Sequence, residues 1–382
     1  MKLLKYGLVI VAVLLILILT RFTYNLRDRH PDFNIDLVID PPAEPGELSV
    51  GFAKMPITPQ VTDTWNDFNG NARYEPEQGE TYNDVNDNNK FDPIWIAGFH
   101  NRRPAQGVHD DLWARVMVID DGATRVAIAS IDAVGFIYDD AVDIRKSAHD
   151  KINCDYTIIS STHVHQAPDL IGIWGESFYK SGVNTDHMRY VKRQTVAAIE
   201  TAVKNLVPVK LRIGQDLEGA IPYVVDSRDP QEMDPGIRII QAIEISSGKT
   251  LGSLVSWSNH PETLWSKNLL ISSDFPHYFR ESVENGVHKG DRLLAQGLGG
   301  ITVFVNGAVG GLMTTNPSHP IPDPFDGEMH KGATFEKAQA QGQQLGLLAL
   351  KAIRSADVME IERAAIAIRA KTISIPLDNR NF

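Results

Sequence analysis

Short, continuous apolar runs recur along the chain and alternate with longer stretches in which apolar residues return every three or four positions. The runs are rich in β-branched residues, which is typical of central strands that are covered on both faces. The expected strands are Arg125–Asp132, Tyr156–Ser161, Lys210–Ile213, Ile239–Ile245, Leu251–Ser258 and Ile301–Asn306.

The periodic stretches predict helices. The clearest apolar face is formed by Met188, Val191, Thr195, Ile199 and Val203. The expected helices are Asp139–Ile152, Thr185–Asn205, Phe275–Glu284 and Thr334–Ala356. Because strands and helices alternate, we expect an α/β fold, a layered sandwich in which a mixed central β-sheet is covered by helices.

The pattern at the start of the chain predicts a single hydrophobic helix. The uncharged run Gly7–Thr20 lies within about twenty mostly apolar residues, enough for one membrane span. The bulky, basic sequence TRFTYNLRDRH that follows offers no small-x-small cleavage site. We therefore expect residues 1–23 to be a signal anchor that holds the remainder outside the cytoplasm, in the periplasm or at the cell surface. The alternative is a cleaved signal peptide on a secreted protein.

Residues 24–48, which contain DPPAEPGE, are expected to be a linker, and the folded domain is expected to occupy 49–382. The last part, AAIAIRAKTISIPLDNRNF, carries two alternating strand-like segments with nothing after them. We therefore expect a domain that is incomplete at its C-terminus or needs further chain.

Composition and charge narrow the possible partners. The 382 residues are 43% hydrophobic and 22% charged, as in globular proteins, and the formal charge is −11. Such an acidic chain is not expected to bind nucleic acid, and any membrane attachment must be hydrophobic. The only cysteine, Cys154, excludes an intrachain disulfide and a cysteine-rich zinc site. The oligomeric state is not predicted.

Histidines follow two of the expected strands. His163 and His165 in SSTHVHQAPD would point to the same face of an extended segment, and His260 follows the strand in SLVSWSNHPETL. Asp132 ends a further strand, and His109 precedes an apolar run in GVHDDLWARV. Ligand sites of open α/β sheets collect beyond the carboxyl ends of strands, so these residues are either a metal site or ordinary polar turn residues.

A second cation site is suggested by the segment ETYNDVNDNNKFDP. Its oxygen donors at alternate positions are Asp84, Asn86, Asn88, the carbonyl of Lys90, and Asp92. Calcium requires such a dense set of oxygen ligands. The segment is therefore either a calcium loop that rigidifies the rim of the site or a plain solvated turn.

Six blocks in order resemble the N-terminal catalytic domain of the neutral/alkaline (non-lysosomal) ceramidases, over roughly 49–380. They are GFAKMPITP, GVHDDLWARVMVID, VAIASID, STHVHQAPD, NHPETLW…LLISSDFPHYFRESVE and VFVNGAVGGL. The resemblance implies a zinc amidase that cleaves N-acylsphingosines with metal-activated water. It assigns zinc to His163 and His260, whereas His109, His165 and Asp132 would line the site and orient the substrate.

Two departures from the family concern the remaining ligands and the nucleophile. The family's other zinc ligands, a Glu and a Tyr, come from a later region, so Glu262 or Asp132 could substitute here. The family's serine aligns with Met313 of GGLMTTN. The neighbouring substrate loop would include Gly310, Gly311, Met313 and Thr314.

Three functions are therefore considered. The first is a membrane-anchored, zinc-dependent hydrolase of amide or ester bonds in a lipid-like substrate. The second is a catalytically silent envelope protein that keeps the fold for binding. The third is a calcium-stabilised hydrolase that acts on an unrelated small substrate.

Overall fold

The structure is a computed structural model and describes residues 2–25, 27–310 and 313–376. It contains two compact units: Val38–Ile368, and a smaller one that combines the residues up to Leu37 with those from Arg369 onward. The smaller unit contains helix α1 (Lys2–Asn25). Its stretch Lys5–Tyr24 has a mean hydropathy of 2.3 and is long and apolar enough to cross a membrane. A signal sequence has the same character, so both interpretations of this segment remain.

The larger unit is built on a nine-stranded sheet in the order β17-β13-β12-β10-β3-β7-β8-β9, with β21 paired to β10. The strands are β3 (Ser49–Pro56), β7 (Trp113–Asp120), β8 (Arg125–Ile131), β9 (Tyr156–Ser161), β10 (Val207–Asp216), β12 (Ile237–Glu244), β13 (Thr250–Trp257), β17 (Ile301–Asn306) and β21 (Met359–Ile361). The pairs β8–β9 and β13–β17 are parallel and the other neighbours are antiparallel. The predicted mixed sheet is therefore confirmed.

The sheet folds back on itself at a short β10–β3 pairing that joins only Val207 and Pro208 to Val50 and Ser49. Side chains from both halves then pack in one apolar cluster, where Phe52 of β3 lies against Gly252 of β13. Strands of both halves are thus covered on both faces, which explains their continuous apolar runs.

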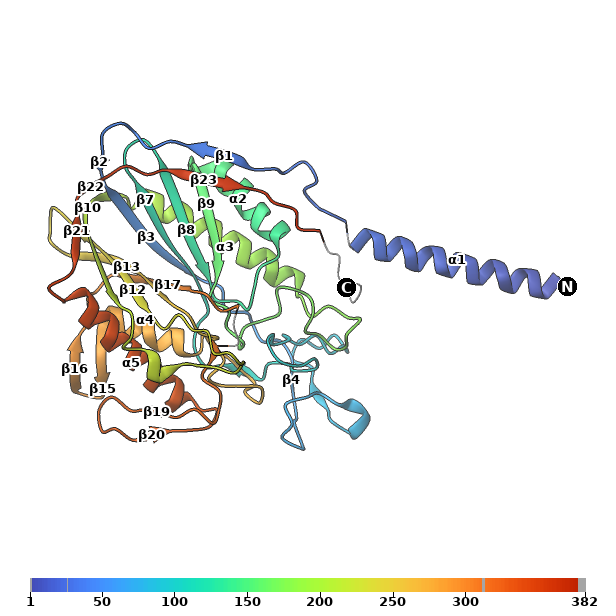
Figure 1. Cartoon of the computed structure of the whole chain (residues 1–382). Coiled ribbons are helices and arrows are strands. Elements are labelled where there is room, and N and C mark those ends of the chain that lie inside the picture. Colours follow the sequence, from blue (N-terminus) through green and yellow to red (C-terminus); the bar gives the residue numbers. More distant parts are fainter. Residues whose placement is uncertain (1, 26, 311–312, 377–382) are drawn as a thin grey trace. The chain divides into compact units, whose positions relative to one another are not determined.

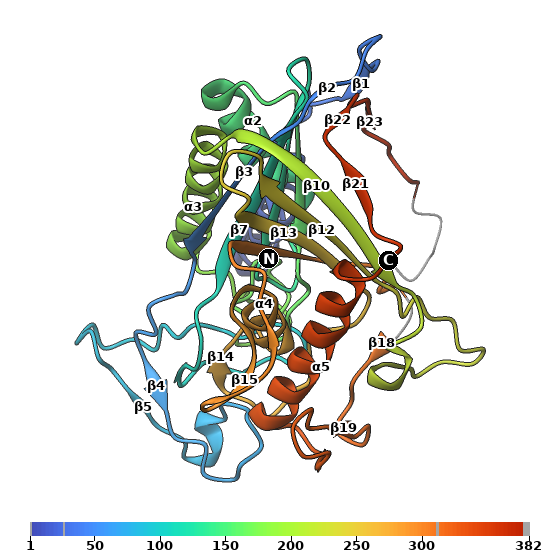
Figure 2. The same cartoon turned by 90° about the vertical axis from the view of Figure 1, so that its left-hand side faces the viewer.

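Two helix pairs cover the outer faces (Figures 1 and 2). Helices α2 (Tyr138–Ile152) and α3 (Thr185–Lys204) pack on β3, β7, β8 and β9. Helices α4 (Phe275–Asn285) and α5 (Phe335–Ile353) pack on β10, β12 and β17. Each of the four expected helices is present, and no bound differs from the predicted one by more than three residues.

The remaining strands are short pairs at the periphery. They are β1 (Asp36–Ile39) with β23 (Ile368–Lys371), β2 (Gly46–Glu47) with β22 (Arg363–Ala364), β4 (Thr64–Trp65) with β5 (Tyr82–Asn83), β6 (Gly107–Val108) with β14 (Leu270–Ile271), β11 (Val225–Asp226) with β18 (Met313–Thr314), β15 (Gly286–Lys289) with β16 (Arg292–Gln296), and β19 (Ile321–Pro322) with β20 (Met329–His330). Two of these strands, β1 and β2, lie within the expected linker.

Candidate metal centre

Three histidines meet beyond the carboxyl ends of β9 and β13. His163, His165 and His260 each offer one ring nitrogen, and these atoms all lie within 4.8 Å of one another. The ring centroids of His163 and His260 are 4.8 Å apart. Imidazole nitrogens at this spacing can hold a divalent metal ion.

Backbone carbonyls orient two of the rings. Nδ1 of His163 lies 2.5 Å from the carbonyl oxygen of Val134, and Nδ1 of His260 lies 2.6 Å from that of Met313. A carbonyl only accepts, so each Nδ1 donates and each Nε2 keeps its lone pair. Metal-binding histidines are commonly fixed in this way.

His163 also has an unusual backbone. Its φ of 66° lies in the left-handed region, which is uncommon for residues other than glycine. Its N–H donates to the carbonyl of Ala133, which lies in the segment that follows β8. Strain of this kind persists where the surroundings over-determine the conformation, and it concentrates at functional sites.

The His165 ring is buried, and neither of its nitrogens has an aligned hydrogen-bond partner. Oε2 of Glu262 is 3.2 Å from Nδ1. Burial, and secondarily the nearby His163 and His260, hold the pKa of His165 well below its usual value. Buried polar atoms without partners are rare, so a neutral imidazole left in this state fits a ligand for a cation.

The segment before Arg103 packs against His165. Gly98 has φ of 107°, and a Cβ placed on it would lie 2.6 Å from Cβ and Cγ of His165. Nη2 of the buried Arg103 donates to the carbonyl oxygen of His165 at 2.5 Å and also to that of Ala97. The backbone and the ring of His165 are therefore both held by this segment.

Glu262 brings a carboxylate to the group. Its Oε1 accepts a hydrogen bond from Oγ1 of Thr314 at 2.5 Å. Burial raises the pKa of Glu262 to about 7, against the lowering effect of the Thr314 hydroxyl. Glu262 is one of the two residues that sequence reasoning offered as a further ligand, and its position is compatible with that role.

A cavity of about 600 Å³ adjoins these residues. Its lining consists of His165, Ser227, His260, Glu262, Trp265, Thr314, Asn316, Pro317 and Ser318. Both polar and apolar groups face this space, as is usual for small-molecule sites. A substrate in the cavity would contact two histidines and the carboxylate directly.

Asp132 is placed differently from expectation. Its oxygens accept from both terminal nitrogens of Arg280, at 2.8 and 3.0 Å, and from Ser273 and the backbone of Trp113. Burial would raise the pKa of this carboxyl, but the Arg280 guanidinium more than offsets it and the pKa is lowered. With its oxygens already used, the Asp132 carboxylate joins β8 to α4 and is poorly suited to orient a substrate.

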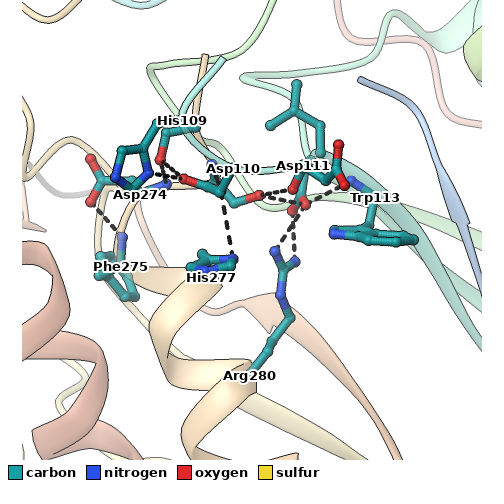
Figure 3. A network of polar contacts seen from close by, with 12 residues as sticks. His109, Asp110, Asp111, Trp113, Asp274, Phe275, His277 and Arg280 are labelled. Atoms are coloured by element: carbon teal, nitrogen blue, oxygen red, sulfur yellow. Dashed lines mark hydrogen bonds and ion pairs between the residues drawn. The ribbon is translucent and has the colours of Figure 1, made fainter. Parts of the chain in front are cut away.

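His109 lies in the same polar network as Arg280, to which Ser273 links it by donating to both Asp110 and Asp132 (Figure 3). Its Nδ1 is 3.0 Å from Oδ2 of Asp110, and its ring stacks on Phe335 with centroids 3.7 Å apart. Asp110 also accepts from Oγ of Ser272 at 2.5 Å and lies 3.7 Å from Nδ1 of His277. Among the described residues, His109 is not part of the three-histidine group.

The Asn/Asp segment forms a turn that is closed by its own hydrogen bonds. Asp84 accepts from the backbone of Asn88 at 3.1 Å, and Asp92 accepts from the amides of Asn86 and Asn88 at 3.4 and 3.1 Å. The backbone of Lys90 donates to Asn88. Such bonds form with or without a cation, so the calcium site remains a prediction.

The expected substrate loop contributes to the candidate site through a backbone carbonyl. Gly310 is the last described residue before positions 311–312, so Gly311 lies outside the described residues. Met313 has a buried side chain in the apolar cluster with α4 and α5, while its carbonyl orients His260. Sequence reasoning missed the carbonyls of Met313 and Val134, because every residue carries a carbonyl and no residue type signals this use.

Solved structures of similar fold are known for most of this chain. No protein-family model matches the chain, and no curated protein matches its sequence. A crystal structure of neutral ceramidase from Pseudomonas aeruginosa is similar, with a TM-score of 0.59 and 18% identity over 81% of this chain and 45% of that one. A ceramidase complexed with C2 gives a TM-score of 0.58 and 18% identity, over 81% of this chain and 44% of that one. The chain spans less than half the length of either structure, and over that span it has a ceramidase-like fold.

Proposed function

We propose that this chain is a zinc-dependent hydrolase that cleaves an amide or ester bond in a lipid-like substrate. The observation that carries the proposal is the group of His163, His165 and His260 beside a cavity. Two of the rings have their lone pairs freed by carbonyl partners, and the third is buried with no aligned hydrogen-bond partner on either nitrogen.

The residues present fit a zinc ion. His163, His165 and His260 would hold it, with Glu262 as a further ligand or as a neighbouring base. Bound zinc polarises a carbonyl and lowers the pKa of water towards ~7. Nitrogen and carboxylate donors in a set of three or four are typical of catalytic zinc sites.

The chain's own groups would then position the reaction. Among the residues that line the cavity, Glu262 is the only acid, and the hydroxyl of Thr314 fixes one of its oxygens. Oε2 of Glu262 is therefore the atom placed to exchange a proton with water or with a leaving group in the cavity. The buried side chain of Met313 supplies no nucleophile, which favours water over a covalent intermediate.

The substrate class rests on the ceramidase-like fold. The two similar structures described above are ceramidases, so we propose an N-acylsphingosine or another lipid-like amide or ester as the substrate. Helix α1 would anchor the chain in a membrane with the larger unit outside the cytoplasm, or would direct its secretion. Calcium in the segment that contains Asp84 and Asp92 would be structural.

The test is metal content combined with turnover. We expect the purified full chain to carry about one zinc, and His163→Ala and His260→Ala to lose it. The control His109→Ala lies outside the group and should keep its metal. Turnover of fluorescent N-acylsphingosines and simple esters should fall in the two variants by more than the roughly 10–100-fold typical of residues around a metal's ligands.

A chelator distinguishes the alternatives. Turnover that a chelator abolishes and zinc restores would exclude a silent binding protein. Equal metal in the wild type and in His163→Ala would overturn the proposed site. Bound zinc without turnover of any amide or ester would favour the binding protein.

A further inference from the structure

The long connection between β9 and α3 has two exposed aromatic side chains at its tip. Phe178 is 85% exposed and Tyr179 is 92% exposed, and their rings meet edge to face with centroids 5.4 Å apart. The connection runs out beyond the ends of the strands (Figure 1). It begins at Thr162 and contains His163 and His165, so it is continuous with the candidate metal centre.

Hydrogen bonds fix this loop along its length. The Asp169 carboxylate accepts from the backbone of Ile171, Gly172 and Trp174 at 2.8 to 3.0 Å. Oδ1 of Asn101 accepts from the backbone of Gly175 at 2.8 Å. Because the arm before the tip is held by these bonds and Ser177 pairs with Lys180 across the tip, the exposure of the tip is built into the fold and is not a consequence of a loose end.

A neighbouring loop adds further exposed apolar side chains. Gly135 lies in the segment after β8, and a Cβ placed on it would lie 2.7 Å from Cδ1 of Ile171, so the two loops touch. We call the exposed apolar residues of both loops the aromatic rim: Ile137, Tyr138, Ile173, Phe178 and Tyr179. The same segment supplies the carbonyl of Val134 that orients His163. Both loops of the rim are therefore anchored to the candidate metal centre.

We propose that the aromatic rim docks on the surface of a lipid bilayer. This inference rests on the proposed function, in which the substrate is lipid-like. Aromatic side chains favour the interface between water and lipid, where a flat apolar ring is partly buried. A chain with a formal charge of −11 gains little from anionic headgroups, so apolar contact is the attraction available to it.

The chain itself identifies the bilayer as the occupant. Helix α1 is apolar and long enough to cross a membrane, and residues 26–35 separate it from β1. Ten residues extend to at most about 35 Å. A compact unit of about 330 residues has a radius of gyration of only ~20 Å. The larger unit can therefore reach the membrane that holds α1 and turn its rim towards it.

Single-cysteine labelling tests this contact in the full chain. Cys154 is buried, so a new surface cysteine can be labelled selectively with an environment-sensitive fluorophore. The label goes on Phe178→Cys, or on the control Leu293→Cys, which is 52% exposed in β16. Both variants are reconstituted into phosphatidylcholine vesicles with or without brominated acyl chains.

We expect brominated lipid to quench the label at position 178 and to leave the label at position 293 unchanged. Equal or absent quenching at the two positions would overturn the proposal. So would a spectral shift at position 178 that depends on protein concentration and not on brominated lipid, because it would assign the rim to contacts between copies of the chain.

A second variant connects the rim to turnover. Phe178→Ser combined with Tyr179→Ser should lower hydrolysis of a vesicle-embedded substrate by about tenfold, since each ring loses interfacial burial. Hydrolysis of a water-soluble short-chain analogue should be unchanged. An equal loss on both substrates would contradict membrane docking. Because quenching does not depend on turnover, the rim and the proposed chemistry can fail separately.

Discussion

The imidazole of His165 packs directly against the backbone of Gly98, and this contact requires a glycine. Gly98 adopts φ of 107°, where a residue with a Cβ is strained, and it lies directly under the ring. A methyl group at this position would meet Cβ, Cγ and Nδ1 of His165 at 2.6 to 2.8 Å. The room for the His165 ring is therefore created by the absence of a side chain.

Replacing this glycine should disturb the proposed zinc site without removing any of the residues proposed to bind the metal. We expect Gly98→Ala to displace the His165 ring and to lower zinc affinity by roughly 10–100-fold, as other changes around metal ligands do. Competition with a chromogenic chelator measures the affinity. The matched control is Gly79→Ala, because Gly79 has φ of 91° but nothing within 4 Å of its would-be Cβ. A zinc affinity as high in Gly98→Ala as in Gly79→Ala would contradict a role for the contact with His165.

For single residues, the sequence predicts which side chains could bind a metal better than it predicts how those side chains are oriented. His163 and His260 stand just after apolar strands, so their convergence could be expected from the α/β pattern. The role of Gly98 could not be expected from the sequence, because it depends on a close approach between Gly98 and His165, which lie far apart in the chain. The resemblance assigns His109 to the site, and the sequence pattern gives no sign of its bond to Asp110.

Among the elements, α4 links the two halves of the sheet. Arg280 of α4 pairs with Asp132 just after β8, and Glu284 of the same helix pairs with Arg115 of β7. All four of these side chains are buried. Buried ion pairs of this kind cost much to break, because the remaining partner is left as an uncompensated charge.

Arg280→Met should therefore lower the free energy of unfolding by about 3–5 kcal/mol. Urea unfolding measures the loss. The control Arg238→Met removes an exposed partner of Asp234 and should cost no more than ~1 kcal/mol. A small loss for Arg280→Met together with strongly reduced turnover would contradict the structural role and return Asp132 to the catalytic residues.

The elements themselves were largely predictable, and their pairing was not. Buried strands and amphipathic helices leave local patterns, which is why the expected strands recur in the sheet. The short β10–β3 pairing that folds the sheet back leaves no pattern, because it joins Val207 to Val50, which lie far apart in the sequence. It also explains why β10 runs from Val207 to Asp216, beyond the expected Lys210–Ile213: its start pairs with β3 and the rest with β12.

For the molecule as a whole, the similarity to ceramidases concerns only part of those proteins. The chain matches 45% and 44% of the two ceramidase structures, so parts of those proteins have no counterpart here. The candidate site nevertheless holds three histidines and one carboxylate within the larger unit. A metal centre supplied by this unit alone is therefore chemically reasonable, and zinc content measured on the chain as it stands tests it.

Helix α1 decides whether the chain stays attached to a membrane. As a signal anchor it should keep its full mass and remain in the pellet after alkaline carbonate extraction, because Lys5–Tyr24 spans the apolar layer. Leu14→Lys with Leu17→Lys places two charges near the middle of the span, at about 2.5–3.5 kcal/mol each, and should release the chain. The control Ile373→Lys, at a residue that is 71% exposed outside the helix, should change nothing. A soluble wild-type product whose N-terminal sequence begins after the apolar run would instead identify a cleaved signal peptide, and the aromatic rim would then have to bind vesicles unaided.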